Sequence, residues 1–339
     1  MADAGQSIED QLIDDILACS PGHEPGTRPI HAPGIAVTGF FQASHVAGHY
    51  TVAEHFGGQR VCVTVRFSNG TGEPNEPDSR RTLVRGMAVK FHLGEGPDAR
   101  DTDMIAMNLP MFFVRTVEEF QDLTRSAVPR PARATPWWRK LGLMLALRDG
   151  PPDPEKGETT SNGAAIFDFG RRCPFAGPAL LTQDMLDAPV GYGTSSYDAV
   201  HAFVLTDGYG NTRFVRFRWE PVDGVQNIPD TGRFDYLQTE LAESLDRGAI
   251  EFVLRMQVAE QGDDASDPTK PWPQRRQRIV MGHLLLKALA PDQRESAELI
   301  DFNPTRLVDG IAVSDDATLR IRGPVYRRSA ERRRAVAGG

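Results

Sequence analysis

The chain has 339 residues, of which 40% are hydrophobic, 25% charged and 8% aromatic. This composition is ordinary for a folded globular protein, and it excludes collagen-like, coiled-coil and wholly disordered chains. The formal net charge of -8 would repel nucleic acid rather than attract it, so we expect no nucleic-acid partner.

The start of the chain and its longest apolar stretch bear on location. Residues 1–18 carry acidic side chains where a secretory signal would carry Lys or Arg, so we expect a cytoplasmic protein. The longest uninterrupted apolar stretch, Leu141–Leu147, is far shorter than the roughly 20 residues that a membrane helix needs, so we expect no stable membrane insertion. The three cysteines are too few for a disulfide framework or a thiolate zinc site.

Helical and then extended patterns follow one another in the first part of the chain. Apolar residues at helical spacing predict a helix over 8–17 that ends near Ser20–Gly22, so residues 1–22 are interpreted as an N-terminal helical arm. Later segments alternate in polarity and are rich in β-branched residues, which predicts short strands in an antiparallel sheet or barrel. The predicted strands are Gly34–Phe41, Arg60–Ser68, Val84–Leu93, Ala199–Thr206, Thr212–Trp219 and Glu251–Val258.

Helical periodicity returns around these strands and indicates an α+β fold. Residues 129–160 are rich in Pro, Arg, Glu and Gly around one apolar helix, and we interpret them as a long excursion rather than a domain boundary. The predicted helices are Val117–Ala127, Trp137–Arg148, Phe234–Arg247 and Val280–Ala288.

No glycine-rich phosphate loop, nucleophile elbow or zinc spacing is present in the sequence. Three segments with arginines and one histidine stand out instead: Arg28–Gly34, Val65–Ser68 and Arg85–Phe91. In the strand that holds the second segment, the two-residue period turns Val and Phe side chains to one face, and Arg66 and Ser68 to the other. The first face is suited to a core and the second to a polar site.

These segments resemble the haem-containing catalases, whose landmarks are Arg-x-x-His-Ala-x-Gly, Arg-Phe-Ser and Arg-Gly-x-Ala-Val-Lys-Phe. The resemblance runs in one order over residues 23–333, and it implies an eight-stranded antiparallel β-barrel with surrounding helices and a buried haem b. The chain stops soon afterwards, as the smaller catalase-related peroxidases do, so residues 334–339 are expected to form a C-terminal tail. Further matching segments are Pro110–Arg115, Pro268–Pro273 and Arg322–Tyr326.

The resemblance assigns the end of the chain to the proximal side of the haem. Tyr326 matches the iron ligand, and Arg322 would lie beside its phenolate on a helix. His201 and Asp316 match the residues that extend this pair and would hold the arginine in place. Without the resemblance, Tyr326 could be an incidental tyrosine in a basic tail.

Three arginines match contacts to the haem propionates: Arg28, Arg66 and Arg333. A guanidinium group can bind a carboxylate through two parallel hydrogen bonds. The alternative is that these residues form ordinary surface ion pairs, which contribute about 0 to 1 kcal/mol each.

On the distal side, His31 matches the residue that moves the peroxide proton from the inner to the outer oxygen, and Ser68 matches its hydrogen-bond partner. Phe113 and Phe120 match apolar residues around the haem, although two phenylalanines before a helix are also typical of an ordinary core.

Departures from the family pattern fall on the distal side and on the helix that carries Tyr326. Met107 stands where the family has a distal asparagine, and Asn108 would point the other way on a strand. Pro324 would kink a helix between Arg322 and Tyr326. Gln274 stands where many catalases have a histidine that helps to bind NADPH, so we do not expect that cofactor.

The sequence therefore favours a haem peroxidase that reduces hydrogen peroxide or organic hydroperoxides with an external organic reductant. Because Met107 replaces asparagine, we expect weak catalase activity, and we expect a monomer or homodimer. One alternative is a fatty-acid hydroperoxide isomerase or dehydratase similar to the catalase-like allene oxide synthases, because Trp137–Leu147 could admit a lipid. Another is a haem-binding barrel without turnover, which an intact His31 disfavours.

Overall fold

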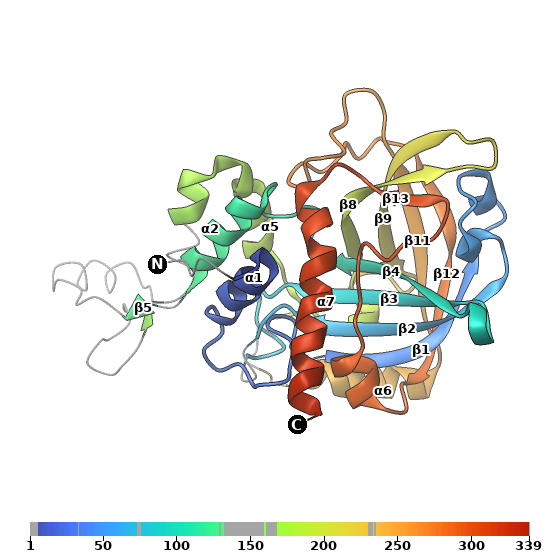
Figure 1. The fold of residues 1–339 in the computed structure, drawn as a ribbon. Helices are drawn as coiled ribbons and strands as arrows, with labels where there is room; N and C mark the ends of the chain where they lie inside the picture. Colours follow the sequence, from blue (N-terminus) through green and yellow to red (C-terminus); the bar gives the residue numbers. More distant parts are fainter. Residues whose placement is uncertain are drawn as a thin grey trace.

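A closed antiparallel β-barrel forms the centre of the structure (Figure 1). The computed structural model describes residues 6–32, 34–72, 76–128, 168–229, 233 and 235–338, and the backbone of 130–131 and 159–160. Within these residues, eight strands follow the order β8-β4-β3-β2-β1-β12-β11-β9, and β9 pairs again with β8 to close the barrel. They are β1 (Gly34–Ala43), β2 (Arg60–Asn69), β3 (Arg85–Leu93), β4 (Arg100–Met107), β8 (Tyr197–Thr206), β9 (Thr212–Pro221), β11 (Ile250–Val258) and β12 (Arg278–Leu289). This barrel with surrounding helices confirms the predicted fold class.

Alternation along the strands separates the core from the site. On β2, Val63, Val65 and Phe67 belong to the hydrophobic cluster that includes most of the buried apolar side chains of the barrel strands. Arg66 and Ser68 lie on the opposite face, because successive side chains of a strand point to opposite sides. The polar face predicted for this strand is therefore confirmed, and the site described below is built on it.

The segment Val280–Ala288, predicted as a helix, is part of strand β12, and that prediction is wrong. A β-bulge leaves Met281 as an extra residue between two pairs that β12 makes with β11. The bulge shifts the alternation, so that the buried residues Met281 and Leu284 stand three apart, as they would on one face of a helix. Periodicity within the segment could not distinguish the two structures.

Strand β4 was not predicted, because charged residues occupy its first half. The carboxylate of Asp103 is buried, and it accepts hydrogen bonds from Lys90 Nζ at 2.7 Å and from Arg306 Nη1 at 2.8 Å. Paired charges of this kind replace the alternation of apolar residues that marks the other strands.

Helices pack around the barrel, and two of them begin at the predicted residues. Within the described residues, no helix is both long and apolar enough to cross a membrane, and the predicted helix Trp137–Arg148 lies outside the described part of the chain. The α-helices are α1 (Ile8–Leu17), α2 (Val117–Ala127), α5 (Gly177–Asp184), α6 (Tyr236–Arg247) and α7 (Ala317–Ala337). Shorter elements are β5 (Arg130–Pro131) with β6 (Thr159–Thr160), β7 (Ala188–Pro189) with β10 (Asn227–Ile228), β13 (Ile311–Val313) beside β8, the 3-10 helices Ala47–His49, Glu54–Phe56, Gly96–Asp98, Pro174–Ala176 and Tyr192–Thr194, and a π-helix at Arg294–Leu299.

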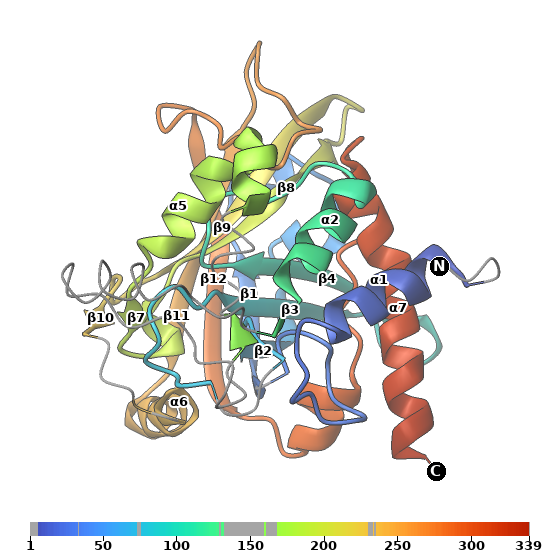
Figure 2. The ribbon, with the colours of Figure 1, turned by 90° about the vertical axis from the view of Figure 1, so that its left-hand side faces the viewer.

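Helix α7 runs alongside the barrel, with α1 and α2 on the same side of the molecule (Figures 1 and 2). It continues through Pro324 and reaches Ala337, so the predicted tail over 334–339 begins inside the helix. Asp10 of α1 binds Arg328 and Arg332 of α7 at 2.8 and 2.6 Å, which holds α1 against the helix. The space between α7, α1 and the outer face of β2 to β4 contains the site.

Candidate functional site

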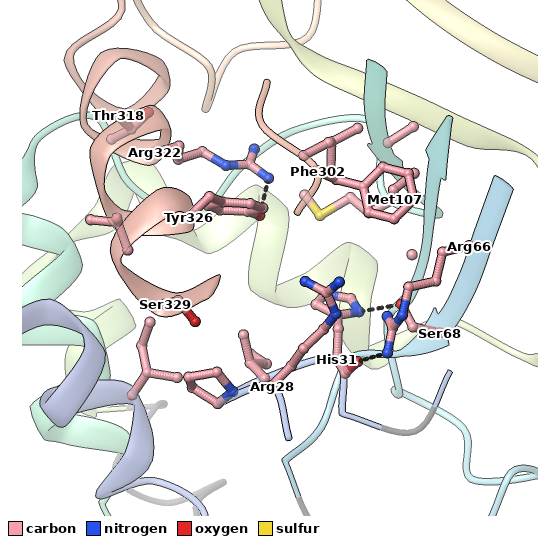
Figure 3. A pocket seen from close by; sticks show the side chains of 18 of the residues that line it. Arg28, His31, Arg66, Ser68, Met107, Phe302, Thr318, Arg322, Tyr326 and Ser329 are labelled. Atoms are coloured by element: carbon pink, nitrogen blue, oxygen red, sulfur yellow. Dashed lines mark hydrogen bonds between the residues drawn. The ribbon is translucent and has the colours of Figure 1, made fainter. Parts of the chain in front are cut away.

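A cavity of about 230 Å³ lies between α7, α1 and the outer face of the barrel (Figure 3). Side chains distant in the sequence meet there: segment 28–31 precedes β1, Arg66 and Ser68 come from β2, Met107 ends β4, and the last group comes from α7. Nine of the ten site residues expected from the sequence line this cavity: Arg28, His31, Arg66, Ser68, Met107, Phe120, Arg322, Tyr326 and Arg333.

A chain of three hydrogen bonds leads to the phenol oxygen of Tyr326. Arg322 Nη2 donates to that oxygen at 2.6 Å, and Arg322 Nη1 donates to His201 Nε2 at 2.8 Å. His201 Nδ1 lies 2.6 Å from Asp316 Oδ2. Because arginine only donates, Nε2 must be the acceptor and Nδ1 must carry the proton, which fixes the tautomer of the neutral imidazole. The structure therefore places these four residues in one hydrogen-bonded chain, and their roles toward a haem stay a prediction.

The local sequence of α7 explains how this chain is positioned. Asp316 is the N-cap of the helix, and its Oδ1 accepts the backbone N–H groups of Thr318 and Leu319 at 2.9 and 3.2 Å. Burial alone would raise the pKa of Asp316, but the hydrogen bonds from His201 and Thr318 hold it below the usual value. Burial, and then the charge of Arg322, lowers the pKa of His201. A fixed carboxylate thus orients a neutral imidazole.

His31 lies across the cavity from Tyr326 in a strained backbone conformation, with φ of +59°. Two contacts fix it: its Nδ1 lies 3.0 Å from Ser68 Oγ, and its carbonyl oxygen accepts a hydrogen bond from Arg66 Nη2 at 2.9 Å. Burial, and then the positive charges of the surrounding arginines, lowers the pKa of His31 to about 3. The ring is therefore neutral near pH 7, and it can accept a proton.

Three residues on neighbouring strands form a row beside His31: Ser68, Gly86 and Met107. Ser68 pairs with Gly86, and Gly86 pairs with Met107. A Cβ atom on Gly86 would lie 2.9 Å from both His31 Nδ1 and Ser68 Oγ, so only glycine leaves room for the imidazole. The sulfur of Met107 points into the cavity (Figure 3). Asn108 does not line it, and its Oδ1 accepts the backbone N–H of Arg85 at 2.7 Å.

Three buried arginines gather at one side of the cavity around a single carboxylate. Arg66 binds Glu298 at 3.2 Å, Arg333 Nε donates to the carbonyl oxygen of Glu298, and Arg28 donates to the carbonyl oxygens of Ala297 and Ile300. Burial and the mutual repulsion of these cations lower the pKa of Arg28, and they lower that of Arg333 to about 10. Arg333 Nη2 is buried without a hydrogen-bond partner. Three arginines and one glutamate leave a net charge of +2 in this cluster, which two further carboxylates would neutralise.

Phe113 is a correction to the expected site. It does not line the cavity but packs against the neighbouring cluster of Val114, Phe169 and Ala176. Phe112 takes the place on the cavity wall, with its ring 5.5 Å from that of His201. Adjacent side chains in an extended segment point to opposite sides, so an error of one residue reverses the direction.

Comparison with known families agrees with this geometry. A family model described as catalase matches residues 7–141 and 152–337. The chain belongs to the catalase family. A catalase-related peroxidase of Mycolicibacterium paratuberculosis is 32% identical over 340 residues, covering 99% of this chain and 98% of the relative. A second catalase-related peroxidase, of Synechococcus elongatus, is 29% identical and covers 92% of this chain and 85% of the relative.

Longer catalases match the same region of this catalase-family chain. Catalase isozyme 2 of Solanum tuberosum is 28% identical, and the match covers 93% of this chain but 62% of the relative. A solved bacterial catalase shares the fold, with a TM-score of 0.73 at 22% identity over 91% of this chain and 58% of that chain.

The residues of this catalase-family chain fit a haem. A phenol oxygen facing a cavity suits ferric iron, and the buried arginines, with the unpartnered Nη2 of Arg333, suit two propionates. No group of three or more His, Cys, Asp or Glu side chains that could hold a bare metal ion exists among the described residues.

Sequence reasoning missed two carboxylates at this site. Glu298 lies on the π-helix Arg294–Leu299, where no motif marks it. Asp198 lies at the edge of the cavity, and burial raises its pKa to about 6. Asp198 pairs with Met107 and therefore lies beside the row of Ser68, Gly86 and Met107. That pairing depends on the closure of the barrel, which the sequence does not specify.

Proposed function

We propose that this protein is a haem-dependent peroxidase that reduces hydrogen peroxide or organic hydroperoxides with an external organic donor. The observation that carries the proposal is one cavity with two differentiated sides. On one side a hydrogen-bonded chain from Asp316 ends at the phenol oxygen of Tyr326, and on the other the neutral ring of His31 is held by Ser68. A carrier without turnover would need no such acid-base group.

In this proposal, Tyr326 would bind the iron of a haem b, and Arg28, Arg66 and Arg333 would bind its propionates. When bound, the haem would supply the ferric iron at which the O–O bond is broken, and would hold two oxidising equivalents until a donor reduces them. The proposed role of Arg322 is to hold the phenol oxygen of Tyr326 in place through the hydrogen bond that it donates.

The proposed role of His31 is proton transfer within the bound peroxide. Its neutral imidazole accepts the proton from the inner oxygen and returns it to the outer oxygen, which then leaves as water or an alcohol. Ser68 and the carbonyl contact with Arg66 keep the ring in place. Replacement of His31 by alanine should slow peroxide cleavage by roughly 10² to 10⁴-fold.

Catalase activity requires the enzyme to oxidise a second hydrogen peroxide molecule, and the cavity supports this poorly. The thioether of Met107 donates no hydrogen bond, and the amide of Asn108 is turned toward Arg85. We therefore propose weak catalase activity and efficient oxidation of organic donors.

Apolar side chains around the cavity support organic substrates. Ile13 and Ile16 of α1 line it, so an organic hydroperoxide or an aromatic donor would meet an apolar wall. Trp137–Leu147, on which the lipid hydroperoxide alternative rests, lies outside the described residues. We further propose that the protein is a cytoplasmic monomer or homodimer that binds no nucleic acid and does not insert stably into a membrane.

The test is an absorption spectrum of the purified protein, followed by stopped-flow mixing with hydrogen peroxide and an aromatic donor. We expect one haem per chain with a phenolate charge-transfer band that Tyr326→Phe removes. Tyr209→Phe is the control, because Tyr209 is 95% exposed. An unchanged spectrum and haem content in Tyr326→Phe would contradict the ligand assignment. Conversion of a fatty-acid hydroperoxide without donor oxidation would favour the isomerase alternative.

A further inference from the structure

The thioether of Met107 is placed differently from the other methionines of β3 and β4. Met87 also borders the cavity, but it is 1% exposed and belongs to the core cluster of the barrel, as does Met104. Met107 lies outside that cluster, and its sulfur is turned into the cavity (Figure 3). The side chain is therefore open to whatever molecule the cavity binds.

Strand pairing brings this sulfur close to the position of the peroxide. His31 packs over Gly86, whose missing Cβ would lie 2.9 Å from the imidazole. Met107 pairs directly with Gly86 on the next strand, and directly opposed residues lie about 4.5 to 5.5 Å apart. With no side chain at Gly86, nothing from β3 separates the thioether from a molecule held by His31.

A thioether at this place is chemically vulnerable. Its sulfur lone pair attacks peroxide oxygen without any prior loss of a proton, so the reaction needs no activation of the sulfur. The side chains that surround the sulfur in the cavity offer no competing thiol or thioether among the described residues, apart from Met87. When no donor restores the haem for another turnover, further peroxide that enters the cavity meets the thioether of Met107.

We propose that Met107 is an oxidation site, converted to methionine sulfoxide by peroxide bound in the cavity when organic donor is scarce. The inference rests on the proposed function, which brings peroxide into the cavity. An S–O bond forms as the O–O bond breaks, sulfur loses two electrons and the peroxide gains two. The departing oxygen takes the proton, with His31 available to carry it, and leaves as water or an alcohol.

Oxidation would change the cavity as well as the residue. It converts a flexible apolar side chain into a polar one, and methionine sulfoxide reductases can reverse it. An apolar donor should then bind less well, so oxidised protein should show a higher KM for such a donor.

The experiment exposes the haem-loaded protein to a few equivalents of hydrogen peroxide without a donor, and then maps oxidation by peptide mass spectrometry. Trypsin should release residues 101–115 as one peptide containing Met104, Met107 and Met111, and fragmentation separates the three. Met104 and Met111, each 6% exposed, are internal references, and Met185, the C-cap of α5, is 68% exposed and reports reaction with free peroxide.

We expect one added oxygen on Met107 before any on Met185, and we expect an aromatic donor to protect Met107 but not Met185. If peroxide is consumed while Met107 stays unmodified or reacts no faster than Met185, this inference is wrong and the proposed function stands. If no peroxide is consumed beyond the level of Tyr326→Phe protein, the proposed function fails. If, in addition, Met107 is then oxidised no faster than Met185, this inference is wrong as well.

Discussion

At the scale of single residues, the distal side of the cavity depends on side chains that are small or turned away. Gly86 leaves the space that His31 occupies, and Asn108 is held by the backbone of Arg85 rather than offered to a ligand. Met107 fills the remaining position with an apolar group.

Gly86→Ala should impair peroxide cleavage while leaving haem binding and folding intact. Its Cβ would come within 2.9 Å of His31 Nδ1 and Ser68 Oγ, so the imidazole must move. A shift of this kind at an active site can cost on the order of 10²-fold in rate. The measurement is the stopped-flow rate of reaction with hydrogen peroxide. Gly48→Ala is the matched control, because its Cβ would meet no heavy atom closer than 3.9 Å; equal rates in both variants would show that His31 is not confined.

Met107→Asn should raise oxygen evolution from hydrogen peroxide more than it raises donor oxidation. An asparagine amide can donate and accept hydrogen bonds to a second peroxide molecule, which a thioether cannot orient. The gain could approach the roughly 10²-fold that correct positioning is worth. Both activities are measured on one preparation, with Met107→Gln as a longer amide for comparison. High oxygen evolution by the unaltered protein would show that the role given to Met107 is wrong.

At the scale of elements, α7 combines structural and chemical roles at its N-cap residue, Asp316. One carboxylate oxygen of Asp316 caps the helix, and the other accepts a hydrogen bond from His201 Nδ1. The sequence predicted the partners of Tyr326 because they are a few residues away on a helix or matched a known segment. It could not predict β12, because a bulge gave a strand the spacing of a helix, nor β4, because its charges are satisfied only in the barrel.

Asp316→Asn and Asp316→Ala should separate these two roles. Asparagine still caps a helix, whereas alanine at an N-cap costs about 0.5 to 2 kcal/mol of stability. The asparagine NH₂ group would favour the other tautomer of His201, leaving two donors facing each other between His201 and Arg322. Both variants should therefore alter the absorption spectrum, but only alanine should markedly lower the free energy of unfolding in urea. A wild-type spectrum in Asp316→Asn would contradict the orienting role.

At the scale of the whole molecule, a buried histidine inside the barrel should limit stability in acid. His55 lies in the 3-10 helix Glu54–Phe56, with its ring 4.2 Å from that of Phe56 and 4.7 Å from that of Phe91. Its Nδ1 has no hydrogen-bond partner, and burial lowers its pKa from 6.5 to about 3. The unfolded chain therefore binds a proton below pH 6.5 that the folded barrel does not.

The penalty from His55 is absent above about pH 6.5 and grows as the pH falls toward 3, where it lowers the free energy of unfolding by on the order of 5 kcal/mol in total. His55→Phe should flatten this dependence, because phenylalanine carries no titrating group and packs in the same aromatic cluster. The free energy of unfolding is measured between about pH 4 and pH 7, with the exposed His49 replaced by phenylalanine as the control. An equal pH slope in His55→Phe and the unaltered protein would exclude this role.

The barrel as a whole could be predicted from the resemblance, and most of the site with it. The two carboxylates that could not be predicted depend on tertiary contacts. Asp198 reaches the cavity because it pairs with Met107 where the barrel closes, and Glu298 reaches the site because the π-helix packs against Arg66. Such contacts join segments far apart in the sequence, so no local pattern records them. The boundary proposed between the arm 1–22 and the domain 23–333 stays a prediction.

The contact between α1 and α7 makes the width of the cavity sensitive to ionic strength. Leu12, Ile13 and Ile16 form one wall, and Asp10 and Asp14 of the same helix pair with Arg328 and Arg332 in positions that are partly open to solvent. Exposed ion pairs weaken as the Debye length shortens from about 10 Å at 0.1 M salt to about 3 Å at 1 M. We therefore expect concentrated salt to loosen this wall while leaving the barrel intact, and we expect the oxidation of bulky donors to increase more than the reaction with hydrogen peroxide.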